Sequence, residues 1–167
     1  MRAVRVELLV IELDEKIRLI LDGVDVAWEV VACDPELADT ANFVKAYGYS
    51  LEDSANTIVV VGKSDPPKYV ACVILASTRL NVNQIVKRRL GVRASFATAE
   101  EGARLTGMTL GGITPIGITD MPIWVDALVM TRDRIVLGGG SRSCKIVTPP
   151  SIFLALPNAE IVDGLAS

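Results

Sequence analysis

The spacing of hydrophobic residues divides the chain into short helices and strands. Apolar residues recur with helical spacing over 12–21, and Gly23 follows as a helix stop. Runs rich in β-branched residues at Thr57–Val61 and Tyr69–Ala76 predict two central strands. The turn sequence at 65–68, with its two prolines, predicts that these strands form an antiparallel hairpin.

The same periodicities predict the remaining elements. Helices are expected over 40–46, 81–90, 98–106 and 149–156. Strands are expected at Val24–Cys33, Ile123–Val129, Arg134–Leu137, Lys145–Val147 and Ala159–Val162. Strands dominate, helices interleave and the connections are irregular. The pattern therefore predicts one α/β domain with a mixed sheet rather than a doubly wound parallel sheet.

Composition supports a single domain of this kind. The chain has 167 residues, half of them hydrophobic and only 5% aromatic, so the core must be built mainly from Val, Ile, Leu and Ala. Cys33, Cys72 and Cys144 form no zinc knuckle or disulfide framework, and we expect buried thiols in a reducing, cytoplasmic compartment. Glu7 and Glu12 interrupt the apolar N-terminal run, so neither a signal peptide nor a membrane span is expected.

Charge narrows the classes of partner. The net charge of −3 argues against a protein that wraps a nucleic-acid duplex, because neutralised phosphates drive such binding. The chain nevertheless contains one dense basic cluster, formed by Lys87, Arg88, Arg89 and Arg93. This basic cluster fits either a solvated helix end, where cations favour the helix dipole, or a landing patch for an RNA backbone.

The complete absence of histidine removes several mechanisms. No Ser-His or Cys-His nucleophilic pair and no histidine-ligated metal can form. The acidic residues are scattered, so we expect them at the surface rather than in a carboxylate metal site. A lysine-based Schiff base or Ser-Lys pair stays open, with Lys63, Lys68 and Lys145 as candidates. Backbone groups are the other source of chemistry.

Two glycine-rich loops could supply such backbone groups. They are Gly111–Gly117 and Gly138–Ser143. Glycine lets the main chain approach a ligand closely, and exposed N–H groups can bind a carbonyl oxygen or a phosphate. Neither loop is a nucleotide-binding fingerprint, so tight structural turns and a ligand cradle both stay open. Arg142 favours the cradle, because a guanidinium suits a phosphate or carboxylate.

Several segments together resemble a known family. Gly-Gly-Ile-Thr-Pro-Ile-Gly at 111–117, preceded by Thr-Gly at 106–107, resembles the "TG…GG-[VI]-[ST]-P-x-G" stretch of YbaK and prolyl-tRNA-synthetase-associated editing domains. Gly138–Ile146 resembles their "GGG-x-R-x-x-x-I" loop and strand, and Asn56–Val60 their "K-T-L-V" strand. Further resembling segments are Asp39–Ala41, Val92–Glu101, Pro122–Asp126 and Pro149–Val162. In order and spacing these segments cover 13–163.

The resemblance implies a fold, an activity and partners. It implies an editing domain over 13–167, built around a mixed, mostly antiparallel, barrel-like sheet with surrounding helices, and an N-terminal extension, 1–12, packed on it. It implies a trans-acting aminoacyl-tRNA deacylase, which hydrolyses the ester of mischarged tRNA with the help of the substrate's ribose hydroxyl. No metal, cofactor or protein nucleophile is implied. The implied partners are the 3′ end of aminoacyl-tRNA and an aminoacyl-tRNA synthetase.

The resemblance also carries site residues over, position by position. The implied catalytic loop consists of Gly111, Gly112, Ile113, Thr114 and Pro115. The implied substrate-binding residues are Asn56, Thr57, Gly139, Gly140, Ser141, Arg142 and Lys145. Amides of the catalytic loop would orient the ester carbonyl. The basic cluster would contact the tRNA backbone.

The sequence departs from the family pattern at two positions. Asn56 stands where the family has a lysine that contacts the substrate, and Lys145 stands where some members have an acidic residue. The side chain of Lys145 would replace the missing charge if it faces the same pocket. Two other functions stay open: a non-catalytic module that binds an aminoacyl-RNA end or a synthetase, and a hydrolase of another small ester or amide.

Overall fold

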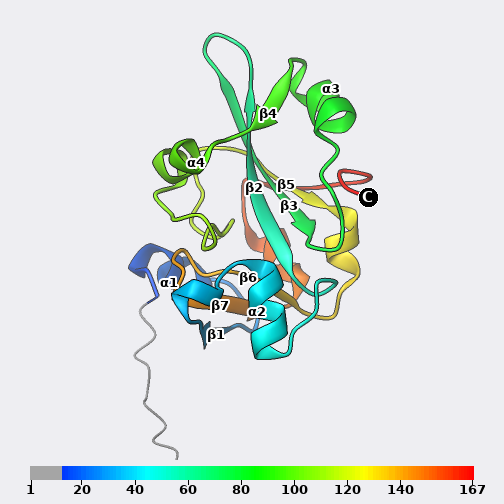
Figure 1. Cartoon of the computed structure of the whole chain (residues 1–167). Helices are drawn as coiled ribbons and strands as arrows, with labels where there is room; N and C mark the ends of the chain where they lie inside the picture. The colour runs from blue at the N-terminus through cyan, green and yellow to red at the C-terminus, as the bar shows by residue number, and fades with distance from the viewer. Residues whose placement is uncertain (1–12) are drawn as a thin grey trace, which may run out of the picture.

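Two sheets organise residues 13–167, the part of the chain that this computed structural model describes (Figure 1). The antiparallel first sheet has the order β1-β7-β6; its strands are β1 (Glu29–Ala32), β6 (Ile135–Gly138) and β7 (Cys144–Thr148). The second has the order β4-β2-β3-β5-β8; its strands are β2 (Ala55–Gly62), β3 (Lys68–Leu75), β4 (Ala94–Phe96), β5 (Ile123–Asp126) and β8 (Ala159–Val162). The expected extension, 1–12, lies outside the described residues.

The mixed α/β fold predicted from the sequence is confirmed. In the second sheet, β4, β2 and β3 pair antiparallel, whereas β3, β5 and β8 pair parallel. The predicted hairpin is the β2–β3 pair, in which Thr57 lies opposite Val73. The term barrel-like holds only loosely, because within 13–167 the two sheets stay open. They meet at a bridge between Ser54 and Val136, where the Val136 N–H donates to the Asp53 carbonyl at 2.8 Å.

All four α-helices within 13–167 end at a glycine. They are α1 (Glu15–Asp22), α2 (Thr40–Tyr47), α3 (Lys87–Leu90) and α4 (Ala99–Thr106). A capping box of Thr98 and Glu101 starts α4, and Gly107 ends it with a φ of +71°. Gly48 ends α2 with a φ of +76°. Figure 1 shows α1, α2 and the first sheet in one half of the molecule, with α3 and β4 in the other.

Four elements differ from the sequence-based expectation. The strand expected over Val24–Cys33 is confined to β1, because β1 pairs only with the four residues Cys144–Val147 of β7. The strand expected over Ile123–Val129 ends at Asp126 and continues as a 3₁₀ turn. The helix expected over 81–90 begins with a π-helical turn, Val82–Val86. The last expected helix is a 3₁₀ turn, Pro150–Ala155.

One apolar core joins the two sheets. Buried residues of α1, such as Leu21, pack with Val73 and Val125 from the second sheet and Ile146 from the first. Burying each such side chain contributes about 1.5–3 kcal/mol to folding. This shared core holds the ends of β2, β6 and β7 close together. None of the helices within 13–167 has the length and apolar character needed to cross a membrane.

Candidate active site

A cavity of about 310 Å³ opens between the start of α2, the first half of β2 and the two glycine loops. It is lined by Ala38, Asp39, Thr40, Ala55, Asn56, Thr57, Ile58, Leu110, Gly111, Ile113, Gly138 and Lys145. Four segments far apart in sequence therefore meet at one hollow. Five of the site residues expected from the sequence line it together, namely Asn56, Thr57, Gly111, Ile113 and Lys145.

The two glycine loops lie against each other. The Gly140 N–H donates to the Gly112 carbonyl at 2.6 Å. A side chain at Gly112 would overlap the backbone of Ser141, and one at Gly138 would overlap the Ile113 carbonyl. Glycine is required here because the two main chains are in direct contact. The loops thus form one continuous wall beside the cavity.

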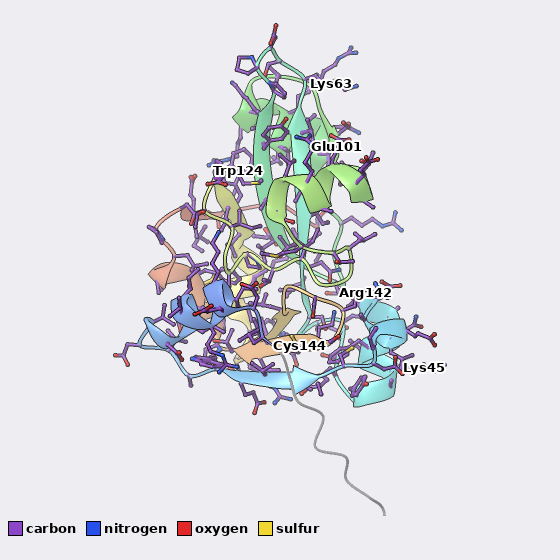
Figure 2. The ribbon with its side chains drawn as sticks, turned by 90° about the vertical axis from the view of Figure 1, so that its left-hand side faces the viewer. Lys45, Lys63, Glu101, Trp124, Arg142 and Cys144 are labelled. Carbon is purple, nitrogen blue, oxygen red and sulfur yellow. The ribbon has the colours of Figure 1, made fainter. Side chains whose placement is uncertain are left out.

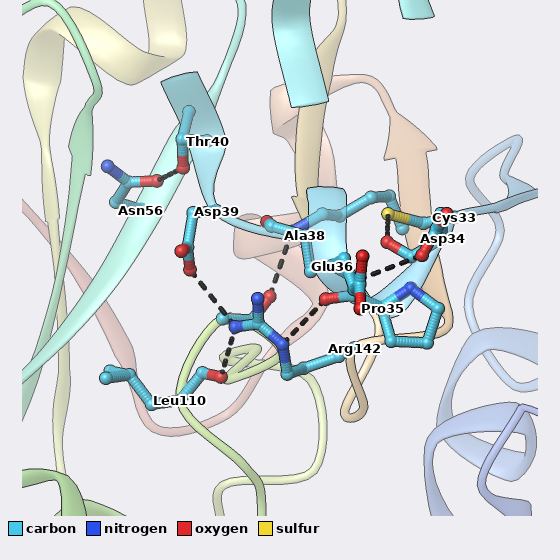
Figure 3. A network of polar contacts seen from close by, with 12 residues as sticks. Cys33, Asp34, Pro35, Glu36, Ala38, Asp39, Thr40, Asn56, Leu110 and Arg142 are labelled. Atoms are coloured by element: carbon cyan, nitrogen blue, oxygen red, sulfur yellow. Dashed lines mark hydrogen bonds and ion pairs between the residues drawn. The ribbon is translucent and has the colours of Figure 1, made fainter. Parts of the chain in front are cut away.

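Arg142 fastens this wall to the segment before α2. Its Nε donates to the Pro35 carbonyl at 2.8 Å, and its Nη1 donates to Asp39 Oδ1 at 3.1 Å and to the Leu110 carbonyl at 3.0 Å (Figure 3). Gly111, with a φ of +88°, gives the guanidinium the room it needs. Only Nη2 has no partner among the described residues. Most of the N–H donors of Arg142, which was expected from the sequence to bind a substrate, therefore bind acceptors of the protein itself.

Lys145 makes a second connection between the same two segments. Its Nζ donates to the Ala38 carbonyl at 2.6 Å and to the Gly111 carbonyl at 2.9 Å. The residue is 6% exposed, and Nζ lies 5.5 Å from the centre of the Phe43 ring. Burial lowers the pKa of Lys145, with a smaller contribution from the nearby Arg142. The lysine therefore places a cation in the cavity that Asn56 also lines.

Thr57 presents its backbone at an unpaired edge of β2. The Ala97 N–H donates to the Val59 carbonyl at 2.9 Å, so the backbone groups of Val59 point away from β3. The backbone N–H and C=O groups of successive residues in a strand point to opposite sides. Those of Thr57, two residues before Val59, therefore also point away from β3. β4 pairs with β2 only over Val60–Gly62, and Thr57 faces the cavity instead. Its Oγ1 is buried without a hydrogen-bond partner in the described structure.

The other residues expected in the site lie behind the cavity wall. Thr114 is fully buried, and its Oγ1 accepts from the Ile116 N–H at 3.4 Å. Pro115 is also buried, and Ser141 contacts Gly112. These residues shape the wall and do not line the hollow. Asp39 and Leu110 do line it, although neither was expected among the site residues, because their place depends on contacts made across the fold.

The basic cluster lies away from the cavity. Gly62, at the far end of β2, packs against Leu90 of α3, whereas the cavity adjoins the beginning of β2. The seven residue steps of β2, at about 3.3 Å each, separate the two places by roughly 20 Å. Arg89 pairs with Glu160 at 2.5 Å and lies 4.9 Å over the Trp124 ring. The remaining members, Lys87, Arg88 and Arg93, are exposed.

Side chains offer few other reactive groups near the cavity. Cys33 and Cys144 are buried, and burial raises the pKa of both thiols, so neither is an activated thiolate. Burial raises the pKa of Cys72 to about 12. Within 13–167, Cys, Asp and Glu side chains form no group of three that could hold a metal ion. The polar groups of the residues that line the hollow are therefore peptide groups, the hydroxyls of Thr40 and Thr57, the Asn56 amide, the Lys145 amine and the Asp39 carboxylate.

Solved structures share this fold. A hypothetical protein, APE2540, matches with a TM-score of 0.81 and 22% identity, covering 92% of this chain and 100% of that one. A proposed trans-editing enzyme for prolyl-tRNA synthetase matches with a TM-score of 0.73 and 22% identity, covering 91% and 98% of the two chains. No curated protein sequence matches the chain.

The sequence itself establishes the family. The model of the aminoacyl-tRNA editing domain matches residues 34–153. This match includes α2, β2, both glycine loops and Lys145, and so spans every segment that lines the cavity. The chain therefore belongs to the aminoacyl-tRNA editing domain family.

Proposed function

We propose that this protein is a trans-acting deacylase that hydrolyses the ester bond of mischarged aminoacyl-tRNA. The observation that carries the proposal is the cavity walled by peptide groups, in which Lys145 and Arg142 fix the glycine loop against the start of α2. Membership of the editing family supports it. So does the similarity to a proposed trans-editing enzyme for prolyl-tRNA synthetase, which suggests a link to that synthetase's errors.

The size of the cavity suits the aminoacyl group rather than a whole nucleotide. Ligand cavities span about 300–1,000 Å³, and this one, at about 310 Å³, lies at the lower end. Ala55, Ile58 and Ile113 provide an apolar surface for a small side chain. The terminal ribose and base would stay at the mouth, near the exposed Leu110. The substrate class is thus a small amino acid esterified to the tRNA 3′ end.

Hydrolysis requires a water molecule to add to the ester carbonyl carbon. The ester C–O bond then breaks, the ribose oxygen takes a proton, and the free amino acid leaves. Peptide N–H groups of Gly111 and Ile113, the two residues of the loop 111–115 that line the cavity, would stabilise the negative charge that develops on the carbonyl oxygen. One such donor is worth about 2.7–4 kcal/mol. The substrate's neighbouring ribose hydroxyl would orient the water, so no protein base is needed.

The basic cluster would contact the acceptor stem while the 3′ end enters the cavity. A separation of roughly 20 Å along β2 is compatible with a rod-shaped stem that approaches from the α3 end. Lys87, Arg88 and Arg93 are the exposed members that could pair with phosphates. Figure 2 shows Lys63, which directly follows the far end of β2, near the top of the view, and Arg142, beside the cavity wall, lower down.

A deacylation panel tests the proposal. Purified protein is incubated with tRNAs charged with alanine, serine, cysteine or proline, and release of the amino acid is followed over time. We expect release above the spontaneous rate for at least one of them, and a large loss in Asn56→Ala. Asn83→Ala is the matched control, because Asn83 is exposed and lies outside the cavity. Release at the spontaneous rate from every tRNA would refute deacylation.

A non-catalytic binding module is the second candidate. The observation that favours it is Asn56, which stands where the family resemblance places a lysine. Fluorescence anisotropy with labelled aminoacyl-tRNA separates the two functions. Specific binding of the charged 3′ end without any release of amino acid would select the binding module.

A further inference from the structure

Thr40 and Asn56 form a hydrogen bond in the lining of the cavity. Thr40 is the first residue of α2, and Asn56 is the second residue of β2. The Thr40 hydroxyl donates to Asn56 Oδ1 at 2.7 Å, as the dashed line in Figure 3 shows. Both residues line the cavity. Two separate elements therefore cooperate to hold one amide group in place.

The direction of this bond leaves the N–H donors of the Asn56 amide free. The amide has one acceptor oxygen and two N–H donors. The oxygen is engaged by Thr40, and Nδ2 has no partner among the described residues. Thr40 itself is held firmly, because α2 is anchored by the buried Phe43 and the Asp39–Arg142 ion pair. A β-branched side chain also has few rotamers. The donors of Asn56 are thus directed away from Thr40 before any ligand arrives.

A fixed donor suits the ligand that the proposed function assigns to this cavity. The aminoacylated 3′ end offers mainly oxygen acceptors, namely the ester carbonyl, ribose oxygens and the terminal phosphate. An amide turned the other way would present its own oxygen to them and repel them. A second cation here would face Lys145, whose pKa is already lowered by burial and, to a smaller extent, by Arg142. A neutral donor avoids that repulsion.

We propose that Thr40 is a positioning residue, which orients the Asn56 amide so that Nδ2 donates to an oxygen of the aminoacylated 3′ end. This inference rests on the proposed function for its substrate. Its structural half, the orientation of Asn56 by Thr40, stands on the hydrogen bond between the two side chains. The orientation of Asn56 by Thr40 and the donation from Nδ2 to the substrate are therefore tested by separate measurements.

The first measurement is single-turnover deacylation with four variants. Thr40→Val removes the hydroxyl and keeps the shape, whereas Thr40→Ser keeps the hydroxyl. We expect Thr40→Val and Asn56→Ala each to slow the reaction of bound substrate about tenfold, the effect of losing one hydrogen bond, with little change in Kd. Thr40→Ser should keep the wild-type rate within about twofold. The double variant Thr40→Val/Asn56→Ala should be no slower than Asn56→Ala, because Thr40 acts only through Asn56.

The second measurement does not depend on turnover. In ¹⁵N–¹H spectra, the side-chain amide signals of Asn56 should differ in chemical shift from those of an exposed asparagine and show a high heteronuclear NOE in the wild type and in Thr40→Ser, because Thr40 holds the amide oxygen. In Thr40→Val these signals should move toward those of the exposed Asn83. Circular dichroism and thermal unfolding show whether each variant folds, and Thr40→Ala, which also lacks the hydroxyl, replaces Thr40→Val in both measurements if Thr40→Val does not fold.

The outcomes separate the two ideas. Wild-type activity in a folded Thr40→Val protein, or rate losses that multiply in the double variant, would overturn the positioning role. Unchanged Asn56 signals in Thr40→Val would overturn the orientation itself. If the wild type releases no amino acid from any charged tRNA, the proposed function fails, and with it the assignment of the substrate oxygen. The spectra then still decide whether Thr40 orients Asn56.

Discussion

The amine of Lys145 donates to the carbonyl oxygen of Gly111 at 2.9 Å, across 34 residues of sequence. The same amine binds the Ala38 carbonyl, so one cation joins the glycine loop to the segment before α2. A free loop rich in glycine would lose much entropy on ordering, and this contact provides the order in advance. The shape of the cavity therefore depends on a buried charge as much as on apolar packing.

Lys145→Met should destabilise the protein and abolish most activity. The variant leaves the Ala38 and Gly111 carbonyls without their donor, at a cost of about 1–3 kcal/mol for an unsatisfied buried group. Removal of a buried charge offsets part of this cost. We expect a net loss of about 1–2 kcal/mol in urea unfolding and at least a tenfold loss of deacylation. Lys45→Met, on the exposed face of α2, is the matched control and should behave like the wild type.

Gly111→Ala should cost more stability than Gly48→Ala. Both glycines have a positive φ, +88° at Gly111 and +76° at Gly48. A side chain at Gly48 meets open space. Gly48→Ala should therefore lower the free energy of unfolding only by the cost of a positive φ in a residue other than glycine, about 1 kcal/mol. A side chain at Gly111 also displaces the Arg142 guanidinium. Urea unfolding should show an additional loss of at least about 1 kcal/mol for Gly111→Ala. Equal losses in the two variants would contradict the close approach.

Asp126 should make stability fall as the pH rises. Its pKa is raised above the ordinary value of 3.8, chiefly by burial, while Oδ1 accepts from the Leu165 and Ala166 N–H groups. The folded state then holds a proton that the unfolded state releases, so stability is lost between pH 3.8 and the raised pKa. Asp126→Asn keeps the acceptor oxygen and should remove this dependence. Unfolding at a series of pH values tests this; parallel curves for the two proteins would contradict it.

Lys145 should act in the opposite direction at high pH. Burial lowers its pKa from the ordinary 10.5, so between the lowered value and 10.5 the unfolded state binds more protons than the folded state. Stability from this group therefore rises with pH across that window. The difference in unfolding free energy between the wild type and Lys145→Met, measured from neutral pH upward, isolates this contribution. A difference that stays constant with pH would show that the amine is not the titrating group.

The exposed part of the basic cluster should contribute to tRNA affinity and its salt dependence. Replacing Arg88 or Arg93 by glutamine should weaken binding uniformly and reduce the slope of log K against log salt by about 1 for each phosphate that is no longer neutralised. Hydrolysis of a small aminoacyl-adenosine, which lacks the stem, should stay unchanged. Arg89 behaves differently, because it pairs with Glu160 and stacks on Trp124. Arg89→Gln should lower stability as well as binding.

Local patterns predicted much of the fold. The hairpin of β2 and β3, the bounds of β8 and the start of α4 at Thr98 follow from alternation, turn residues and capping, which depend on neighbours in sequence. The early end of β5 at Asp126 did not follow. It depends on Leu165 and Ala166, whose N–H groups bind that carboxylate about 40 residues away. Alternation cannot signal such a partner.

The site was predicted in outline but not in its internal connections. The order and spacing of the motifs indicated that the two glycine loops belong to the site. In the structure these loops lie in contact. The sequence could not show that Arg142 directs its donors to Pro35, Asp39 and Leu110. An arginine beside glycines looks the same whether it binds a ligand or a carbonyl, because only the fold determines which acceptor is nearest.

The backbone contact between Gly112 and Ser141 limits how this pocket can be redesigned. No residue larger than glycine fits at position 112, so one side of the hollow has a fixed contour that substitutions cannot adjust. An engineer who wants a larger or smaller amino acid to enter must work on the facing strand, at Ala55 or Ile58. Natural divergence in substrate choice among relatives with the same two loops faces the same restriction.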